Sequence, residues 1–118
     1  ENLIRHSKDA DVLFHEAQAN HQLAIMRNAL ADQKGLVTIL NDIETYHATP
    51  IEAAQAANLA NVDHLMFYHL TPAPRNNLME RMFFRGVRDV RKDWSSSKDG
   101  TMVVLPLDSD EIIITEIN

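Results

Sequence analysis

The sequence of 118 residues contains no cysteine. This absence excludes a disulfide framework and a zinc site built from thiolates. No stretch approaches the roughly 20 consecutive apolar residues of a membrane-spanning helix, and the first ten residues lack the apolar segment of a secretion signal. We therefore expect no membrane association. The chain starts without methionine, which indicates processing or truncation.

Basic residues are also scarce, since 11 lysines and arginines stand against 17 acidic residues and the net charge is −6. A surface that binds nucleic acid or anionic lipid neutralises many phosphates with basic side chains. The charge therefore disfavours such partners and leaves room only for a local basic patch. A length of 118 residues allows one domain at most, and the apolar fraction of 45% is that of a folded chain.

Apolar periodicity predicts an α/β alternation of strands and helices. The expected elements, in order, are a strand at 12–14, a helix at 17–34 that Gly35 closes, a helix within 36–47, a helix from Thr49 to about Asn61, a strand at 63–70, a helix at about 75–92, a flexible link at 95–101 and a hairpin of strands at 101–107 and 111–117. Thr49, Pro50 and Glu52 have the spacing of a capping box, and the helix that they begin is mostly alanine.

Histidines follow the predicted strands. His15 and Glu16 end the first strand, His69 ends the second, and His47 stands just before the alanine-rich helix. Ligands of open α/β sheets bind at the carboxyl ends of strands, so these side chains are expected at one edge. The stretch Tyr-His-x-Thr-Pro occurs at both His47 and His69.

Each of these residues has a chemical and a structural interpretation. His69 is a candidate zinc ligand, although a single histidine at a strand end is more often hydrogen-bonded structure. His47 could protonate a leaving group while Glu16 orients its ring, or it could serve only in a turn. His15 could bond the backbone, while His6, His21 and His64 are expected on the surface.

The predicted helix at 75–92 has a polar arc of Arg81, Arg85, Arg88 and Lys92. Such an arc could attract a phosphate- or sulfate-bearing substrate, but it is usually the solvated face of a helix. Phe84 flanks this arc. If it were exposed, it would indicate a surface covered by a partner subunit or a missing domain.

The segments ADVLFHEAQ, YHATPIEAAQAANLANVDHLMFYHLTP and the closing hairpin resemble the C-terminal half of metallo-β-lactamase-fold hydrolases, in the branch of ribonuclease Z and arylsulfatase-like enzymes. The resemblance implies half of an αββα sandwich. It implies that His69 binds one ion of a two-zinc centre, that His47 is the general acid or transition-state stabiliser, and that Glu16 is its carboxylate partner. The ligand motif His-x-His-x-Asp-His of the N-terminal half is not present in this chain.

Residues 1–118 are accordingly expected to be a single partial domain, inactive alone, of a zinc-dependent hydrolase that cleaves a phosphodiester, sulfate ester or related ester with metal-activated water. Gln18 in HEAQ departs from the His-Glu-Ala-Thr motif of the transfer-RNA processing enzymes, and Thr-Pro-Ile-Glu after His47 resembles the arylsulfatase-like branch. The resemblance therefore implies a small-molecule ester rather than RNA as the substrate. Half of a sandwich would leave one face of its sheet uncovered, and an exposed apolar face of this kind recruits another surface. We therefore expect a homo-oligomer or association with the missing N-terminal half. The alternative is a small α/β association module with structural histidines and no catalysis.

Overall fold

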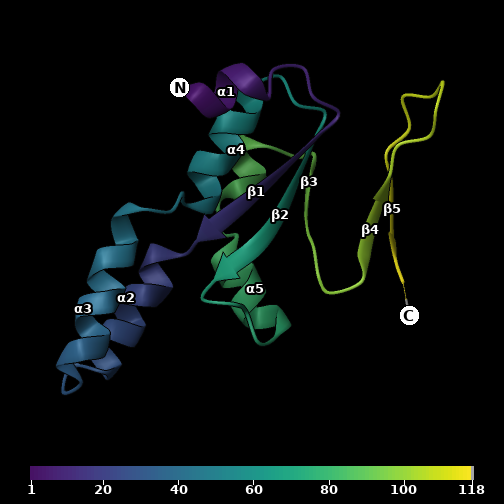
Figure 1. Ribbon diagram of the computed structural model, residues 1–118. Helices are drawn as coiled ribbons and strands as arrows, with labels where there is room; N and C mark the ends of the chain where they lie inside the picture. Colours follow the sequence, from purple (N-terminus) through teal and green to yellow (C-terminus); the bar gives the residue numbers. More distant parts are fainter. Residues whose placement is uncertain (118) are drawn as a thin grey trace.

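The computed structural model describes residues 1–117 and has a mixed α/β fold. Its main sheet consists of three parallel strands in the order β1-β2-β3, with helices packed against it (Figure 1). A separate antiparallel hairpin, β4-β5, follows at the C-terminal end. The elements are α1 (Asn2–His6), β1 (Val12–Gln18), α2 (Asn20–Ala29), α3 (Lys34–Asp42), the 3-10 helix η1 (Ile43–Thr45), α4 (Pro50–Leu59), β2 (His64–Thr71), α5 (Asn77–Phe83), α6 (Val87–Val90), β3 (Trp94–Ser96), β4 (Thr101–Val104) and β5 (Ile113–Glu116).

Helix α4 begins with the predicted capping box. The Thr49 hydroxyl accepts a hydrogen bond from the Glu52 amide, and the Glu52 carboxylate accepts one from the Thr49 amide. These bonds satisfy amides that the first helical turn leaves without partners. The interaction with Thr49 also holds the pKa of the Glu52 carboxyl below its usual value.

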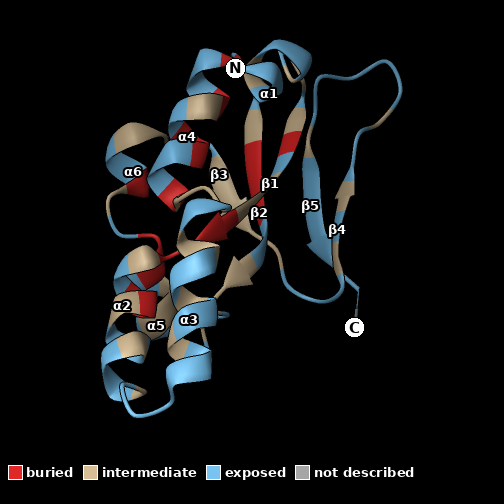
Figure 2. Ribbon diagram, turned by 60° about the vertical axis from the view of Figure 1, so that its left-hand side comes forward, coloured by how far each residue is buried: buried red, intermediate tan, exposed pale blue. Residues whose placement is uncertain are grey.

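The core lies between α4 and the sheet. Ala53, Ala54 and Ala57 of α4 are fully buried and belong to one cluster with Leu65 and Phe67 of β2. Figure 2 shows this buried layer along the central strands and the facing side of α4. Alanine has no side chain beyond Cβ, so the α4 backbone can lie close to the strands.

Helices α2 and α3 form a hairpin that projects from the end of the sheet (Figure 1). The helix expected over 17–34 is shorter at both ends. Strand β1 continues to Gln18 and pairs with Thr71, so α2 starts at Asn20, and it ends at Ala29. The prediction for Gly35 was wrong. It lies inside α3 rather than closing the preceding helix in a left-handed conformation.

The single helix expected over 75–92 is in fact two short helices, α5 and α6. Gly86 separates them with a φ of 87°, a left-handed conformation that glycine adopts without steric cost. The break allows the neighbours Phe83 and Phe84 both to be buried. Phe84 is therefore only 6% exposed and packs against Phe67, so it does not mark a partner surface.

The arginines of this region do not form one stripe, because Arg81 lies on α5, Arg85 in the break and Arg88 on α6. The segment expected to be only a flexible link contributes most of β3, which pairs with Leu65, Met66 and Phe67 in the first half of β2.

The C-terminal hairpin was predicted correctly, and its register runs from Thr101 opposite Glu116 to Val104 opposite Ile113. It stands beside the main sheet in Figure 1 and keeps apolar side chains such as Ile113 and Ile114 exposed. None of the helices within residues 1–117 has the length and apolar character needed to cross a membrane.

Candidate functional site

Glu16 holds the loop before α4 with both of its carboxylate oxygens. Oε2 lies 2.7 Å from Nδ1 of His47, and Oε1 accepts a hydrogen bond of 3.2 Å from the amide of Ala48. The side chains of His47 and Glu16 are 29% and 24% exposed, respectively. The pair is therefore partly shielded from solvent and still accessible to a ligand. Because Nδ1 faces Glu16, the Nε2 edge of the imidazole points away from the carboxylate.

The end of β1 anchors the same loop through the backbone. The Gln18 amide donates to the Ala48 carbonyl over 2.8 Å, and the buried Gln18 side chain donates to the Ile43 carbonyl over 3.1 Å. Strand β1 therefore positions His47 from several points, although the sequence separates Glu16 from His47 by 31 residues.

His69 occupies an irregularity in β2. Glu16 is opposite Tyr68 and Ala17 is opposite Leu70, so His69 has no partner residue in β1. Its φ of 45° lies in the left-handed region. A bulge of this kind redirects a side chain, and bulges are frequent beside active sites. Here the extra residue lets Leu70 pack against the core while His69 stays exposed.

The structure brings the three predicted site residues together. The ring centroids of His47 and His69 are 6.4 Å apart, and Glu16 contacts His47 directly. Phe14 and Tyr68, which flank this region on β1 and β2, are about half exposed and meet edge to face. The site therefore lies at the carboxyl end of two parallel strands, beside the sheet face that carries these open aromatic rings.

His15 and His64 have structural partners. Nδ1 of His15 lies 2.6 Å from the Glu16 carbonyl oxygen. His64 was expected on the surface, but it is half-buried and its Nε2 lies 2.8 Å from the Ser95 hydroxyl. Burial, followed by the positive charge of Arg91, lowers the pKa of His64 below its usual 6.5. The missed strand β3 explains this difference, because it covers His64.

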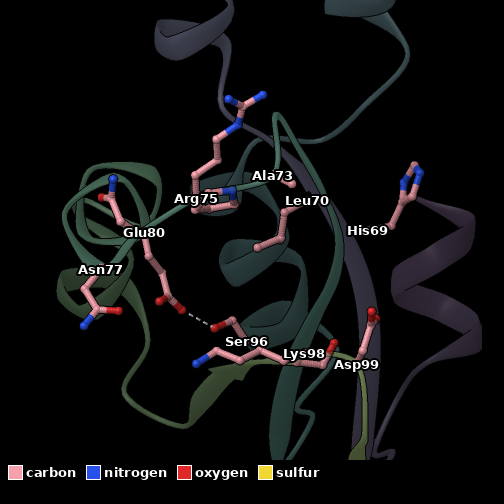
Figure 3. Close-up of a pocket in the computed structure, with 12 residues that line it drawn as sticks. His69, Leu70, Ala73, Arg75, Asn77, Glu80, Ser96, Lys98 and Asp99 are labelled. Carbon is pink, nitrogen blue, oxygen red and sulfur yellow. Dashed lines mark hydrogen bonds between the residues drawn. The ribbon is translucent and has the colours of Figure 1, made fainter.

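A cleft of about 420 Å³ opens beside His69 (Figure 3). Its polar lining comes from the loop after β2, from α5 and from the end of β3, and the Ser96 hydroxyl donates a 2.6 Å hydrogen bond to Glu80. Figure 3 shows the His69 imidazole at the rim, pointing away from this pair. Arg75 and Lys98 supply positive charge to the lining.

Sequence reasoning missed these lining residues. The rule that ligands bind at the carboxyl ends of parallel strands would have indicated Ser96 and Lys98 if β3 had been recognised.

Within residues 1–117, no group of three or more histidine, aspartate or glutamate side chains is arranged to hold a metal ion. A zinc centre needs three or four ligands. The exposed imidazole of His69 fits one position in such a set, and the rest of the set would have to come from outside the described residues.

No protein-family model matches the sequence, and a search among curated proteins finds no matching relative.

Proposed function

We propose that this chain is the C-terminal half of a zinc-dependent hydrolase of the metallo-β-lactamase fold, and that it is inactive alone. The observation that carries the proposal is the hydrogen-bonded pair of Glu16 and His47 beside an exposed His69 on a bulge. A carboxylate that orients an imidazole, beside a second imidazole free to bind metal, can serve as acid catalyst and as one ligand in metal-assisted ester hydrolysis.

In this proposal His69 is a ligand of one ion of a two-zinc centre, and the N-terminal half supplies the other ligands. Bound zinc would lower the pKa of a water molecule and polarise the scissile group. His47 donates a proton to the leaving oxygen, or stabilises the charge that develops there. Glu16 accepts a hydrogen bond from Nδ1 of His47, so the proton given to the leaving oxygen would be the second proton of an imidazolium, carried on Nε2.

The proposed substrate is a small-molecule phosphodiester, sulfate ester or related ester rather than RNA. The cleft beside His69 is small. Its lining contains the cations Arg75 and Lys98, which can bind an anionic ester group, together with the carboxylates Glu80 and Asp99, so it is not a cationic surface of the kind that binds RNA. The net charge of −6 disfavours the long polyanionic contact that RNA recognition uses.

The exposed rings of Phe14 and Tyr68 support association with the N-terminal half. A sheet buries both faces in a layered domain, so this face is expected to be covered in the complete protein. The same observation favours the alternative, in which the chain is an association module that forms homo-oligomers and its histidines are structural.

Metal analysis and an ester-hydrolysis panel on the full-length protein test the proposal. We expect His69→Ala to lose metal and activity together. We expect His47→Ala to retain metal and to slow turnover by about a hundredfold or more. His21→Ala, which replaces an exposed histidine on α2, is the matched control and should change neither.

Equal metal loss in the His47→Ala and His69→Ala variants would contradict these separate roles. A full-length protein that binds no zinc and hydrolyses no phosphodiester, sulfate ester or lactone would favour the association module. The upstream coding sequence gives a further test, because the proposal requires a His-x-His-x-Asp-His motif there.

A further inference from the structure

We propose that a pocket between α2 and α5 binds the apolar body of an anionic small molecule, and that Arg75 binds its charged group. The pocket has a volume of about 670 Å³, within the roughly 300–1,000 Å³ typical of small-molecule sites. This inference goes beyond the hydrolase proposal and does not depend on it.

The walls of the pocket are mainly apolar. Ile25 and Met26 come from α2, and Met79 and Met82 come from α5. Ile25, Met26 and Met82 are 60%, 39% and 43% exposed, so a ligand that covered them would remove apolar surface from water. Methionine side chains are unbranched and adapt to the shape of what they contact, which suits a flexible hydrocarbon or an aryl group.

Gln22 fixes the spacing of the two walls. Its side chain is on α2, is only 7% exposed, and donates a 3.2 Å hydrogen bond to the Met79 carbonyl of α5. This hydrogen bond joins the first turn of α2 to α5. The pocket is therefore held between tied helices before any ligand arrives.

Arg75 gives the pocket its charge preference. It is the one charged residue among the described residues that line this pocket, and it follows the loop of Pro72 and Pro74. The ion pairs within residues 1–117 are Arg27–Glu44 and His47–Glu16, so Arg75 forms no ion pair there, although Glu80 and Asp99 line the adjoining cleft. An uncompensated guanidinium at an apolar pocket favours a ligand that combines an apolar body with a carboxylate, sulfate or phosphate group.

Arg75 also lines the cleft beside His69. Figure 3 shows its side chain extending away from Glu80, out of the polar end of that cleft. An anionic group at Arg75 would therefore lie between the methionine-lined pocket and the His69 site, with the apolar body in the former.

Binding of sodium decanoate to the purified chain, measured by calorimetry below the micellar concentration, tests this site. Acetate and decanol are the matched probes, because each keeps only one half of the proposed ligand. We expect decanoate to bind more tightly than decanol, and acetate not to bind. Arg75→Gln should weaken decanoate binding about tenfold, or about 1.4 kcal/mol, and decanol binding less than twofold.

Matched variants on α5 separate the pocket from general surface adsorption. Met82→Gln should weaken both decanoate and decanol about fivefold, because it removes apolar contact. Leu78→Gln replaces a residue that is 68% exposed and does not line the pocket, so it should change neither affinity. Arg81→Gln is the corresponding control for Arg75→Gln.

Three outcomes would overturn the proposal. They are undetectable decanoate binding, equal losses from Leu78→Gln and Met82→Gln, and a decanoate affinity that Arg75→Gln leaves unchanged. Sedimentation gives a further outcome. If the chain is a dimer, and if both added decanoate and the Met82→Gln substitution dissociate it, the pocket binds a second copy of the chain instead. None of these results bears on the roles of His47 and His69, which metal analysis of the full-length protein decides.

Discussion

Replacing Glu16 with glutamine should destabilise the chain well beyond an ordinary surface mutation. The carboxylate accepts hydrogen bonds from Nδ1 of His47 at 2.7 Å and from the Ala48 amide at 3.2 Å. Glutamine has a single oxygen and presents an NH₂ group to the second donor. A hydrogen bond to a charged group contributes about 1.5–3 kcal/mol, and partial exposure of the pair places its loss near the lower end.

A loss of about 1.5 kcal/mol corresponds to a decrease in Tm of about 6 °C for a domain of this size. Thermal unfolding followed by circular dichroism measures it. The matched control is Glu44→Gln, which removes the other carboxylate ion pair, with Arg27 at 2.8 Å. Glu44 is more exposed than Glu16, at 38% against 24%, and within residues 1–117 it accepts a hydrogen bond from Arg27 alone, whereas Glu16 accepts two. Pairs near the surface contribute about 0.2–1 kcal/mol, so Tm should decrease by no more than about 4 °C.

Hydrogen exchange adds a local measurement. In Glu16→Gln the Ala48 amide should exchange faster than in the parent chain, whereas Glu44→Gln should leave it protected. Equal Tm decreases in the two variants, with Ala48 protected in both, would refute the conclusion that Glu16 positions the His47 loop.

Three further predictions concern the backbone and the titration of the fold. His69→Gly should be more stable than His69→Ala by about 1 kcal/mol in urea unfolding, because φ at this position is 45°, whereas at an ordinary strand position glycine would be the less stable. Stability should decrease as the pH falls below 6.5, because the unfolded chain protonates His64 before the folded chain does, and His64→Gln should reduce this slope in unfolding measured from pH 7.5 to 5. Gly100→Ala should expose the β4-β5 amides to hydrogen exchange, since the added Cβ would lie 2.7 Å from the Ile117 carbonyl oxygen. Gly35→Ala is the comparison: the added Cβ has open space around it, so the substitution should raise the free energy of unfolding by about 0.5 kcal/mol.

Local patterns predicted much of the fold. The Thr49–Glu52 spacing located the start of α4, and the continuous apolar run identified β2. Both signals depend on contacts within a few residues or on burial on both faces, so the sequence alone carries them.

Elements that depend on distant contacts were not predicted. The periodicity of 75–92 fits one helix, and only packing of both Phe83 and Phe84 into the core reveals the break at Gly86. Strand β3 is three residues long and rich in serine, and it exists because β2 supplies its hydrogen-bond partners.

The candidate site divides in the same way. The position of Glu16, His47 and His69 at one edge followed from strand ends and a helix start. The bulge at His69 did not, because it arises from pairing between β1 and β2. The pocket between α2 and α5 was not predicted either. It depends on a contact between helices that are far apart in the sequence, since Gln22 and Met79 are 57 residues apart.

The alanine layer of α4 has a consequence for remodelling this protein. Because Ala53, Ala54 and Ala57 have no side-chain torsions to adjust, the α4 backbone sits at a separation from the strands that their Cβ atoms determine. His47 lies three residues before the start of α4, so the separation of α4 from the sheet contributes to the distance between His47 and His69, together with the bonds from Glu16 and Gln18. One added methyl group at Ala53, Ala54 or Ala57 would push α4 away from the strands, and this shift would change the distance between the two imidazole rings without contact with either ring.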